Sequence, residues 1–427
     1  MPLTFFWLFL IFTFAGMPVV FGLAAAPYLG ILLAEREAFL TVIPQRIFLG
    51  INQFPLLAIP LFILAGELMN AGQITQRIVR FANSMVGHFR GGLGHVTIVS
   101  AMLFSGLSGS AVADASALGA LLIPGMEKQG YSKRYAAALL ASATVLGPII
   151  PPSIIMVIYA YVMQVSVAGL FLAGMGPGIV VTIGLMVVHY LISRKRGYPM
   201  NERMASLREF GQAGKGAFLP LLTPVIILGG MLGGIFTPTE AAGTAVFYAL
   251  ILGLLVLGTL RVRDLPEICL RTGVISAAIL LVVGTATVFG WIASLSGVPN
   301  WLASTLFGYT QDPYTLLFIV NVLLLVTGMF LDAGPAILIL GPILGPTMVQ
   351  LGVDPLHFAI IMCVNLSIGL ATPPMGLLLF VCSSMTRLPI EAIVREMLPY
   401  YTVHVGVIFL VTYVPAVAMW LPKAFGF

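Results

Sequence analysis

Residues 147–153 read Gly-Pro-Ile-Ile-Pro-Pro-Ser, and residues 369–376 read Gly-Leu-Ala-Thr-Pro-Pro-Met-Gly. Both stretches interrupt apolar sequence, and they are counterparts, because residues 106–152 align with 328–374 without a gap. The alignment pairs glycine with glycine and proline with proline. These residue types fix unusual backbone conformations, so the repeat duplicates a shape. Paired interruptions of this kind in the two halves of an apolar chain are typical of the binding site of a membrane transporter.

The composition restricts the fold class. Of the 427 residues, 59% are hydrophobic and 8% are charged, and the mean hydropathy is +1.07. This excludes a soluble domain and predicts an all-α polytopic protein in a lipid bilayer, with roughly ten spans at about 20 residues each. The net charge of +5 is assigned to loops that orient the chain, so no nucleic-acid partner is expected.

Several kinds of chemistry find no support in the sequence. The three cysteines and five histidines are scattered, without the spacing of a disulfide framework or a transition-metal cluster. No nucleotide-binding P-loop occurs, and no cofactor is expected. Residues 106–110 resemble the nucleophile elbow of a hydrolase, but Ser110 replaces its last glycine and no histidine partner is evident. The chain is therefore not expected to be an enzyme.

The N-terminal stretch Met1–Ala26 superficially resembles a signal peptide. No Lys or Arg precedes its apolar run, which is also too long for the hydrophobic region of such a peptide. We expect a first membrane helix here, retained in the mature protein.

The basic residues predict the topology. Five segments hold 17 of the 20 Lys and Arg residues: 73–92, 127–134, 194–216, 261–271 and 387–396. If all five are cytoplasmic, residues 93–126 must enter and leave by that face, as a re-entrant hairpin that turns near Ser105–Ser110. By the same logic, residues 314–350 form a second hairpin that opens from the outer face.

The remaining apolar segments complete two inverted repeats. Residues 131–166 and 355–386 are predicted to be interrupted helices, and the other spans are 167–193, 217–236, 239–260, 272–292 and 399–421. The first repeat then covers residues 1–193 and the second covers 237–427. The basic linker and connecting span, 194–236, reverse the orientation of the second copy.

Four breaks are expected at membrane depth: the hairpin tips at 105–114 and 328–335, and the helix interruptions at 147–153 and 369–376. Irregular backbone is tolerated at this depth only inside protein or beside a watery cavity. Its free carbonyl groups suit a hard cation such as Na⁺. Its free N–H groups, at the positive end of a helix dipole, suit a carboxylate.

Four acidic residues, Glu67, Asp114, Glu240 and Asp332, fall within predicted spans, where a carboxylate needs a partner or a function. Asp332 is the strongest candidate because its tip faces Thr372–Pro374, although it could also cap the following helix. Asp114 is either a site residue or a structural cap. Glu240 is expected to start a helix, and Glu67 to be solvated or paired with an arginine.

Other polar residues carry two interpretations. The hydroxyl groups of Ser105, Ser108, Ser110 and Thr372 could ligate a cation or bond their own backbone, and their clustering at the breaks favours the first. Asn365 is expected to form a buried interhelical amide contact, and the glycines of 229–234 to allow close helix packing.

Four ordered motifs resemble a known family. Residues 108–114 (Ser-Gly-Ser-Ala-Val-Ala-Asp), 147–153, 234–242 (Gly-Ile-Phe-Thr-Pro-Thr-Glu-Ala-Ala) and 370–376 are similar to the large membrane subunit of TRAP transporters, the tripartite ATP-independent periplasmic transporters. The resemblance covers residues 3–422. It implies a multi-pass protein of the bacterial inner membrane that imports an organic acid with Na⁺ as coupling ion. It also implies two partners as separate chains, a small TRAP membrane subunit and a periplasmic substrate-binding protein.

The resemblance further implies an elevator mechanism. A transport domain of about 91–166 and 314–386 would move against a scaffold that includes 4–33, 53–72 and 167–193 and that docks the small subunit. One sodium site would involve Ser105, Ser108, Ser110, Gly147 and Pro151, and the other Gly328, Asp332, Gly369, Thr372 and Met375. The residues assigned to the substrate are Ser108, Gly109, Asp114, Pro152, Ser153, Ala333, Gly334 and Pro374.

The sequence leaves alternatives open for both the substrate and the mode of transport. The resemblance is closer to the sialic-acid branch, and the C4-dicarboxylate class stays open. The main alternative is a stand-alone Na⁺/carboxylate symporter or ion antiporter without a receptor. A channel and a structural scaffold are disfavoured, because neither needs two mirror-image sites.

Overall fold

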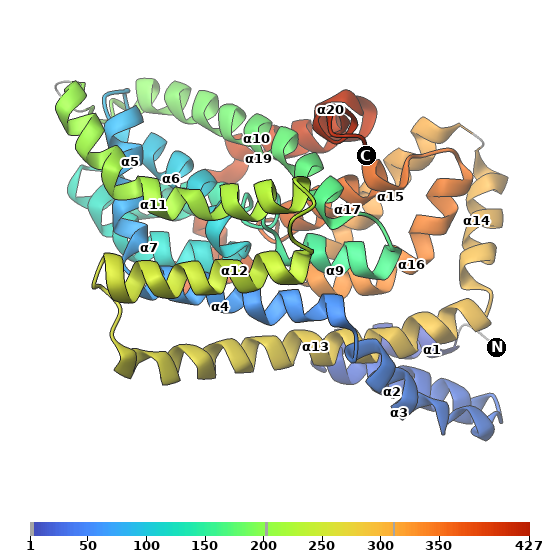
Figure 1. Ribbon diagram of the computed structural model, residues 1–427. Helices are drawn as coiled ribbons and strands as arrows, with labels where there is room; N and C mark the ends of the chain where they lie inside the picture. The colour runs from blue at the N-terminus through green and yellow to red at the C-terminus, as the bar shows by residue number, and fades with distance from the viewer. Residues whose placement is uncertain (1–3, 201–203, 311) are drawn as a thin grey trace.

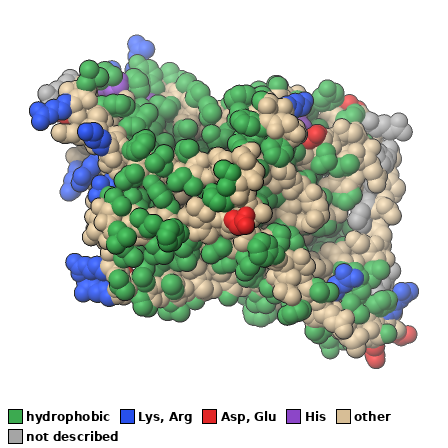
Figure 2. Space-filling model, viewed as in Figure 1, with side chains coloured by type: hydrophobic (Ala, Val, Ile, Leu, Met, Phe, Trp, Pro, Cys, Tyr) green, Lys and Arg blue, Asp and Glu red, His purple; other side chains and the backbone are tan. Residues whose placement is uncertain are grey.

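The structure, a computed structural model, describes residues 4–200, 204–310 and 312–427. These residues form helices joined by turns, with no strand among them. Eight helices are long and apolar enough to cross a membrane, which confirms an all-α polytopic protein. The long helices run side by side across Figure 1, Lys and Arg side chains gather at the left edge of Figure 2, and apolar side chains cover the middle.

The two repeated segments form corresponding helices. In the first, α6 (Gly92–Ser108) and α7 (Ala111–Lys128) make a helical pair, followed by α8 (Lys133–Thr144) and α9 (Ile154–Met163). In the second, α15 (Pro313–Phe330) and α16 (Ala333–Gln350) follow each other, and then come α17 (Pro355–Gly369) and α18 (Leu377–Thr386). Each predicted hairpin segment thus contains two helices, and each predicted interruption lies between two helices. Helix α6 packs against α7, whereas α15 packs mainly against α17, and α16 against α9, α13 (Leu265–Leu295) and α17. The Pro151–Pro152 and Pro373–Pro374 bonds are both cis.

Equivalent residues begin the repeated helices. Ser110 caps α7, and its counterpart Asp332 caps α16. Ser132 caps α8, and its counterpart Asp354 caps α17. Each side-chain oxygen accepts a hydrogen bond from a backbone N–H of the first helical turn, which would otherwise lack a partner. The same backbone shape is thus built with a neutral cap in one half and an acidic cap in the other.

The other helices surround these elements. They are α1 (Thr4–Phe14), α2 (Val19–Leu33), α3 (Val42–Ile51), α4 (Ala58–Ala71), α5 (Ile74–Val86), α10 (Val167–Arg196), α11 (Leu207–Leu232), α12 (Pro238–Leu250), α13 (Leu265–Leu295), α14 (Val298–Tyr309), α19 (Ile390–Tyr413) and α20 (Ala416–Ala424). A π-helical segment, Ile251–Val256, prolongs α12. Helix α12 packs against α4 and α11, and α13 packs against α2, α3 and α4.

The prediction of one continuous membrane helix at the N-terminus is wrong. Instead of one helix over Met1–Ala26, the chain forms α1 and α2, which pack against each other. Gly16 between them has a φ of +85°, a left-handed conformation that ends a helix, and Pro18 precedes the next one. Residues 1–3 of the expected helix, and 201–203 of the basic linker, lie outside the described residues.

Further boundaries also differ from the prediction. The expected span 399–421 is divided, because α19 ends at Tyr413 and Pro415 precedes α20. The sequence did not predict α3 or α14, and the basic segment 73–92 contains the helix α5. The glycines of 229–234 do not bring two helices together. A Cβ atom at Gly230 would meet the ring of Phe236, which folds back onto the end of its own helix.

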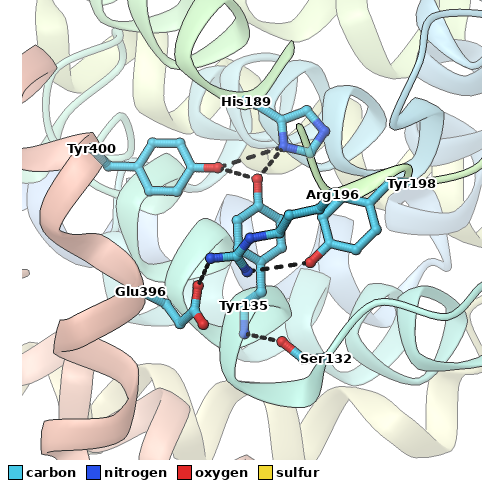
Figure 3. A network of polar contacts seen from close by, with 7 residues as sticks. All are labelled: Ser132, Tyr135, His189, Arg196, Tyr198, Glu396 and Tyr400. Carbon is cyan, nitrogen blue, oxygen red and sulfur yellow. Dashed lines mark hydrogen bonds and ion pairs between the residues drawn. The ribbon is translucent and has the colours of Figure 1, made fainter. Parts of the chain in front are cut away.

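A buried polar network joins α8, α10 and α19 (Figure 3). The Tyr135 hydroxyl oxygen lies 2.7 Å from His189 Nδ1 and 2.6 Å from the Tyr400 hydroxyl oxygen. His189 Nε2 lies 2.9 Å from the carbonyl oxygen of Gly91, immediately before the first hairpin. All three side chains are fully buried. Helices α10 and α19 are therefore held to α8 and to the start of the first hairpin by specific hydrogen bonds as well as by apolar packing.

Replacing Tyr135 with phenylalanine is expected to lower the free energy of unfolding by about 1–3 kcal/mol, because His189 and Tyr400 would each lose a buried partner. Thermal unfolding of the purified protein measures the change. Tyr190→Phe, on the exposed side of α10, is the matched control and should unfold like the wild type. Equal stability of the two variants would contradict a stabilising role for the network.

Candidate functional site

The first hairpin tip encloses a buried carboxylate. Asp114, in the first turn of α7, is fully buried. The Ser105 hydroxyl oxygen lies 3.2 Å from Asp114 Oδ2, and the Ser108 hydroxyl donates to Oδ1. Since hydroxyl groups and a carboxylate are oxygen ligands that hard cations prefer, this cluster has the chemistry of a cation site. The structure thus brings together three predicted residues, and Asp114 lies with the proposed cation ligands.

Two glycines let the first interruption approach this tip. A Cβ atom at Gly147 would lie 2.7 Å from the Ala111 nitrogen and 2.8 Å from Asp114 Oδ2. A Cβ atom at Gly109 would lie 2.5 Å from the Pro152 carbonyl oxygen, and its φ is +62°. No other residue type fits either position without displacing backbone. Predicted residues of the tip and of the interruption are therefore in direct contact.

The second tip meets the second interruption through backbone alone. A Cβ atom at Gly369 would lie 2.6 Å from Gly328 Cα. The Gly376 N–H donates to the carbonyl oxygen of Met329 at 3.2 Å. The Thr372 hydroxyl donates to its own helix, at the carbonyl oxygen of Ile368 (2.9 Å). The interface is thus a glycine–glycine contact, with one threonine hydroxyl oxygen beside it as an acceptor.

The roles of the other acidic residues can be read from their contacts. Asp332 accepts a hydrogen bond from the Ala333 N–H at 2.7 Å, so the predicted cap is confirmed. Glu240 accepts from the Thr237 backbone N–H and hydroxyl, both at 2.8 Å, as expected for a helix start. Glu67 is half-buried and forms no ion pair with any residue that the structure describes. Of the two alternatives for Glu67, solvation or pairing with an arginine, the structure shows no arginine pair among the described residues.

Asn365 forms the predicted interhelical amide contact. Its side-chain nitrogen donates to Asn321 Oδ1 on α15 at 2.9 Å. The Asn321 side-chain nitrogen donates in turn to the Thr412 hydroxyl on α19 at 3.0 Å. The second hairpin is thereby fastened to α17 and α19 by buried polar contacts.

A cavity of about 230 Å³ lies between the two tips. Predicted site residues that line it are Gly109, Ser110, Asp332, Ala333 and Gly334. The wall also includes Pro148, which lies in the predicted interruption but was not assigned to a site. Other wall residues were not indicated by the sequence: Ile154, Ile155 and Ile158 after the first interruption, and Ala278, Ile279 and Val282 of α13. The last three are ordinary residues of an unbroken apolar helix, so no sequence signal distinguishes them.

The remaining predicted residues lie elsewhere. Pro152 and Ser153 are buried behind the wall, where the Ser153 hydroxyl donates to the Pro148 carbonyl oxygen at 2.6 Å. Pro151 is also buried, and Pro374 is exposed. Met375 lines a separate apolar cavity of about 530 Å³, beside Phe330 of α15. The structure therefore does not bring Pro374 or Met375 to the cavity between the tips.

The cavity has one neutral and one acidic helix start. The first turn of α7, capped by Ser110, and that of α16, capped by Asp332, both line it. A helix N-terminus attracts anions through its dipole and its free N–H groups, but an acidic cap satisfies part of that attraction. Asp114, in the first turn of α7, does not line the cavity. With that carboxylate neutralised by a cation, the α7 side of the cavity suits an anion, whereas the acidic cap makes the α16 side suit a cation. Among the residues that the structure describes, neither Lys nor Arg lines the cavity.

Comparisons with known proteins point to one family of membrane transporters. The family model described as "Tripartite ATP-independent periplasmic transporter, DctM component" matches residues 6–417. The sialic acid TRAP transporter large permease protein SiaM of Vibrio cholerae is 43% identical, over 98% of this chain and 97% of that protein. The C4-dicarboxylate TRAP transporter large permease protein DctM of Pseudomonas aeruginosa is 40% identical, over 89% of each. Among solved structures, the YdaH transporter of Alcanivorax borkumensis has a similar fold, with a TM-score of 0.61, 16% identity, and coverage of 92% of this chain and 90% of that chain.

Proposed function

Since this chain belongs to the DctM family of tripartite ATP-independent periplasmic transporters, as a multi-pass protein of the bacterial inner membrane, we propose that it imports an organic acid by coupling to Na⁺. The observation that carries the proposal is the cavity between the two hairpin tips, with an oxygen cluster behind one tip and an acidic cap at the other. Transport needs a substrate site coupled to ion sites, and these elements are adjacent.

The substrate class follows from the electrostatics of the cavity. A carboxylate placed at the start of α7 would meet free N–H groups and a positive dipole end without needing a basic side chain. The two relatives compared above are named for sialic acid and C4-dicarboxylates, and both substrates carry carboxylate groups. We assign the substrate to Ser110 and Ala111 on one wall and to Ala333 and Gly334 on the other.

The ion sites are proposed at the two contacts between a tip and an interruption. Site one comprises Asp114, Ser105, Ser108 and the backbone around Gly147. Site two comprises Asp332, Thr372 and the backbone around Gly328 and Gly369. Ser110 belongs with the substrate wall in this scheme, and Met375 would contribute only through its backbone. Because each site joins a tip to an interruption, bound Na⁺ would hold the substrate cavity together.

We propose an elevator movement of two inverted repeats, with the division at residues 194–236. Its support is that α6 and α7 lie toward the left of Figure 1 whereas α15 and α16 lie toward the right. The contacts favour a revised division between the two bodies. Helices α10 and α19 bond to α8 through the network of Figure 3, and the Tyr401 hydroxyl donates to the Ala371 carbonyl oxygen in the second interruption at 2.8 Å. We therefore assign 167–193 to the moving body and not to the scaffold.

The scaffold would then consist of α1–α4 and α11–α13, with α13 facing the substrate cavity. The expected partners are the small membrane subunit on the scaffold and a periplasmic substrate-binding protein that supplies the substrate. Exposed apolar side chains on α1 and α13, such as Trp7, Leu270 and Val274, give the scaffold a surface suited to lipid or to another membrane helix.

Uptake into proteoliposomes tests the proposal. The chain, its small subunit and a purified receptor are reconstituted, and sialic acid and a C4-dicarboxylate are offered under an inward Na⁺ gradient. We expect uptake that requires both Na⁺ and receptor. Na⁺-driven uptake without receptor would instead favour a stand-alone symporter, and saturable uptake without Na⁺ would overturn the coupling.

Asp332→Ala is expected to lower this uptake by about 10–100-fold, because it removes a charged ligand from the second ion site. Asp332→Asn keeps the helix cap, since asparagine caps helices about as well as aspartate, and loses only the charge. If Asp332→Asn transports like the wild type, the carboxylate is a cap alone and the second site is wrongly assigned.

A further inference from the structure

Arg46 lies outside the five basic segments that predict the cytoplasmic face. It is one of three Lys or Arg residues outside the five basic segments, with Arg36 and Lys423. It lies on α3, which packs against α13. Since cationic side chains on the outer face oppose the usual orientation signal, a role other than topology is needed to explain Arg46.

Arg46 lines a second cavity, of about 370 Å³, next to the cavity between the tips. The two cavities share Leu338 of α16 as a wall. Along α13 the inner cavity is lined by residues 278–282 and the second by residues 286–294, which continue away from the basic end of this helix. At about 1.5 Å per residue, the second cavity covers the next few turns of α13 toward the outer face.

The guanidinium group is positioned without being neutralised. Its central carbon lies 5.2 Å from the centre of the Trp291 ring on α13. No carboxylate in the described part of the chain pairs with Arg46, and no acidic residue lines the cavity. Stacking on an aromatic ring fixes the plane of an arginine and leaves its N–H edges free to bind a carboxylate in a forked arrangement.

The rest of the lining supplies additional hydrogen-bonding groups. Tyr161, Gln164, Thr287 and Ser294 line the cavity with Arg46. The Gln164 amide nitrogen is engaged by the carbonyl oxygen of Tyr161 at 2.6 Å, so its oxygen remains as an acceptor for a substrate hydroxyl. Ser294 is exposed to the cavity and can donate to a carboxylate. A cation with polar neighbours thus stands beside the route to a substrate cavity that contains no basic residue.

We propose that Arg46, held by Trp291, forms an outer carboxylate-binding site that captures the organic anion before it passes to the cavity between the tips. The proposal rests on the proposed function for its cargo, but the charge of the site is tested independently of transport. Capture by a fixed charge raises the local concentration of an anion and its association rate. Arg46 would also disfavour cations of similar size at this position.

The test measures the electrostatic potential beside Arg46. Ser294→Cys is introduced together with Cys269→Ala, which removes the exposed native thiol, whereas Cys363 and Cys382 are buried. Reaction rates are compared for 2-sulfonatoethyl and 2-(trimethylammonium)ethyl methanethiosulfonate, which differ in the sign of their charge. Adding Arg46→Gln should lower the ratio of anionic to cationic rate by about tenfold. Arg46→Lys should preserve most of it, and Arg36→Gln, an exposed arginine outside the cavity, should leave it unchanged.

Two further results decide the assignment. Sialic acid or a C4-dicarboxylate should protect the cysteine from both reagents when Arg46 is present, and much less in Arg46→Gln. A rate ratio that is insensitive to Arg46, or an absence of protection by either acid, would overturn the proposal. Failure of Na⁺-driven uptake in the wild type, with the rate ratio as expected, would instead contradict the proposed function and leave the anion site in place.

Discussion

Asp114→Asn is expected to raise the Na⁺ concentration that gives half-maximal uptake by about 10–100-fold, because it weakens Na⁺ binding at the proposed first ion site. Asparagine keeps the size of the side chain and one oxygen that can accept from Ser105 or Ser108, so the tip should retain its shape. What is lost is the negative charge that a bound cation would neutralise. A fully buried carboxylate is costly in a membrane, and a cation that shares the site would offset that cost.

Glu240→Gln is the matched control. This carboxylate also accepts hydrogen bonds at the start of a helix, but it is exposed and far along the chain from both tips. Its replacement should leave the Na⁺ dependence unchanged. If Asp114→Asn and Glu240→Gln have the same half-maximal Na⁺ concentration, the Asp114 cluster is structural and the first ion site is elsewhere.

Gly369→Ala is expected to abolish uptake, lowering it by about 10²-fold, and to destabilise the protein by about 1–3 kcal/mol. The added methyl group would lie 2.6 Å from Gly328 Cα, and backbone atoms cannot withdraw as a flexible side chain does. The second tip would have to separate from the second interruption. Thermal unfolding and uptake by the same preparation measure the two effects.

Gly273→Ala, on α13, separates this steric effect from the general preference of helices for alanine. A Cβ atom at Gly273 meets nothing within 4 Å, so this variant should be at least as stable as the wild type. Wild-type uptake by Gly369→Ala would show that the two backbones need not touch, and the proposed second site would lose its geometric basis.

The sequence predicted the elements whose cause is local. Each Pro-Pro pair removes two successive backbone N–H donors, which a continuous α-helix does not accommodate, so the breaks between α8 and α9 and between α17 and α18 were predicted. The basic segments predicted the face from which each hairpin opens, which stays a prediction. Single residues also suffice to explain two smaller successes, the helix start at Glu240 and the buried amide of Asn365.

What the sequence did not predict depends on contacts between distant segments. Ala278, Ile279 and Val282 became cavity residues only because α13 packs beside α16. The attachment of α10 to α8 and to the start of the first hairpin depends on His189 meeting Tyr135 and Gly91, which lie 54 and 98 residues away. Arg46 did carry a signal, since it stood outside the five basic segments, but its meaning required Trp291 beside it.

The wall that α13 contributes to the inner cavity has an evolutionary consequence. The contacts between tips and interruptions are made by glycines and backbone, which leave little freedom for substitution. Ala278, Ile279 and Val282 touch the same cavity from a helix that belongs to neither hairpin. Under the proposed function, exchange of these side chains would alter the shape offered to the substrate while the residues of the proposed ion sites stay unchanged. Substrate selectivity can therefore diverge among related proteins by substitutions on a single helix, without changes at the proposed ion sites.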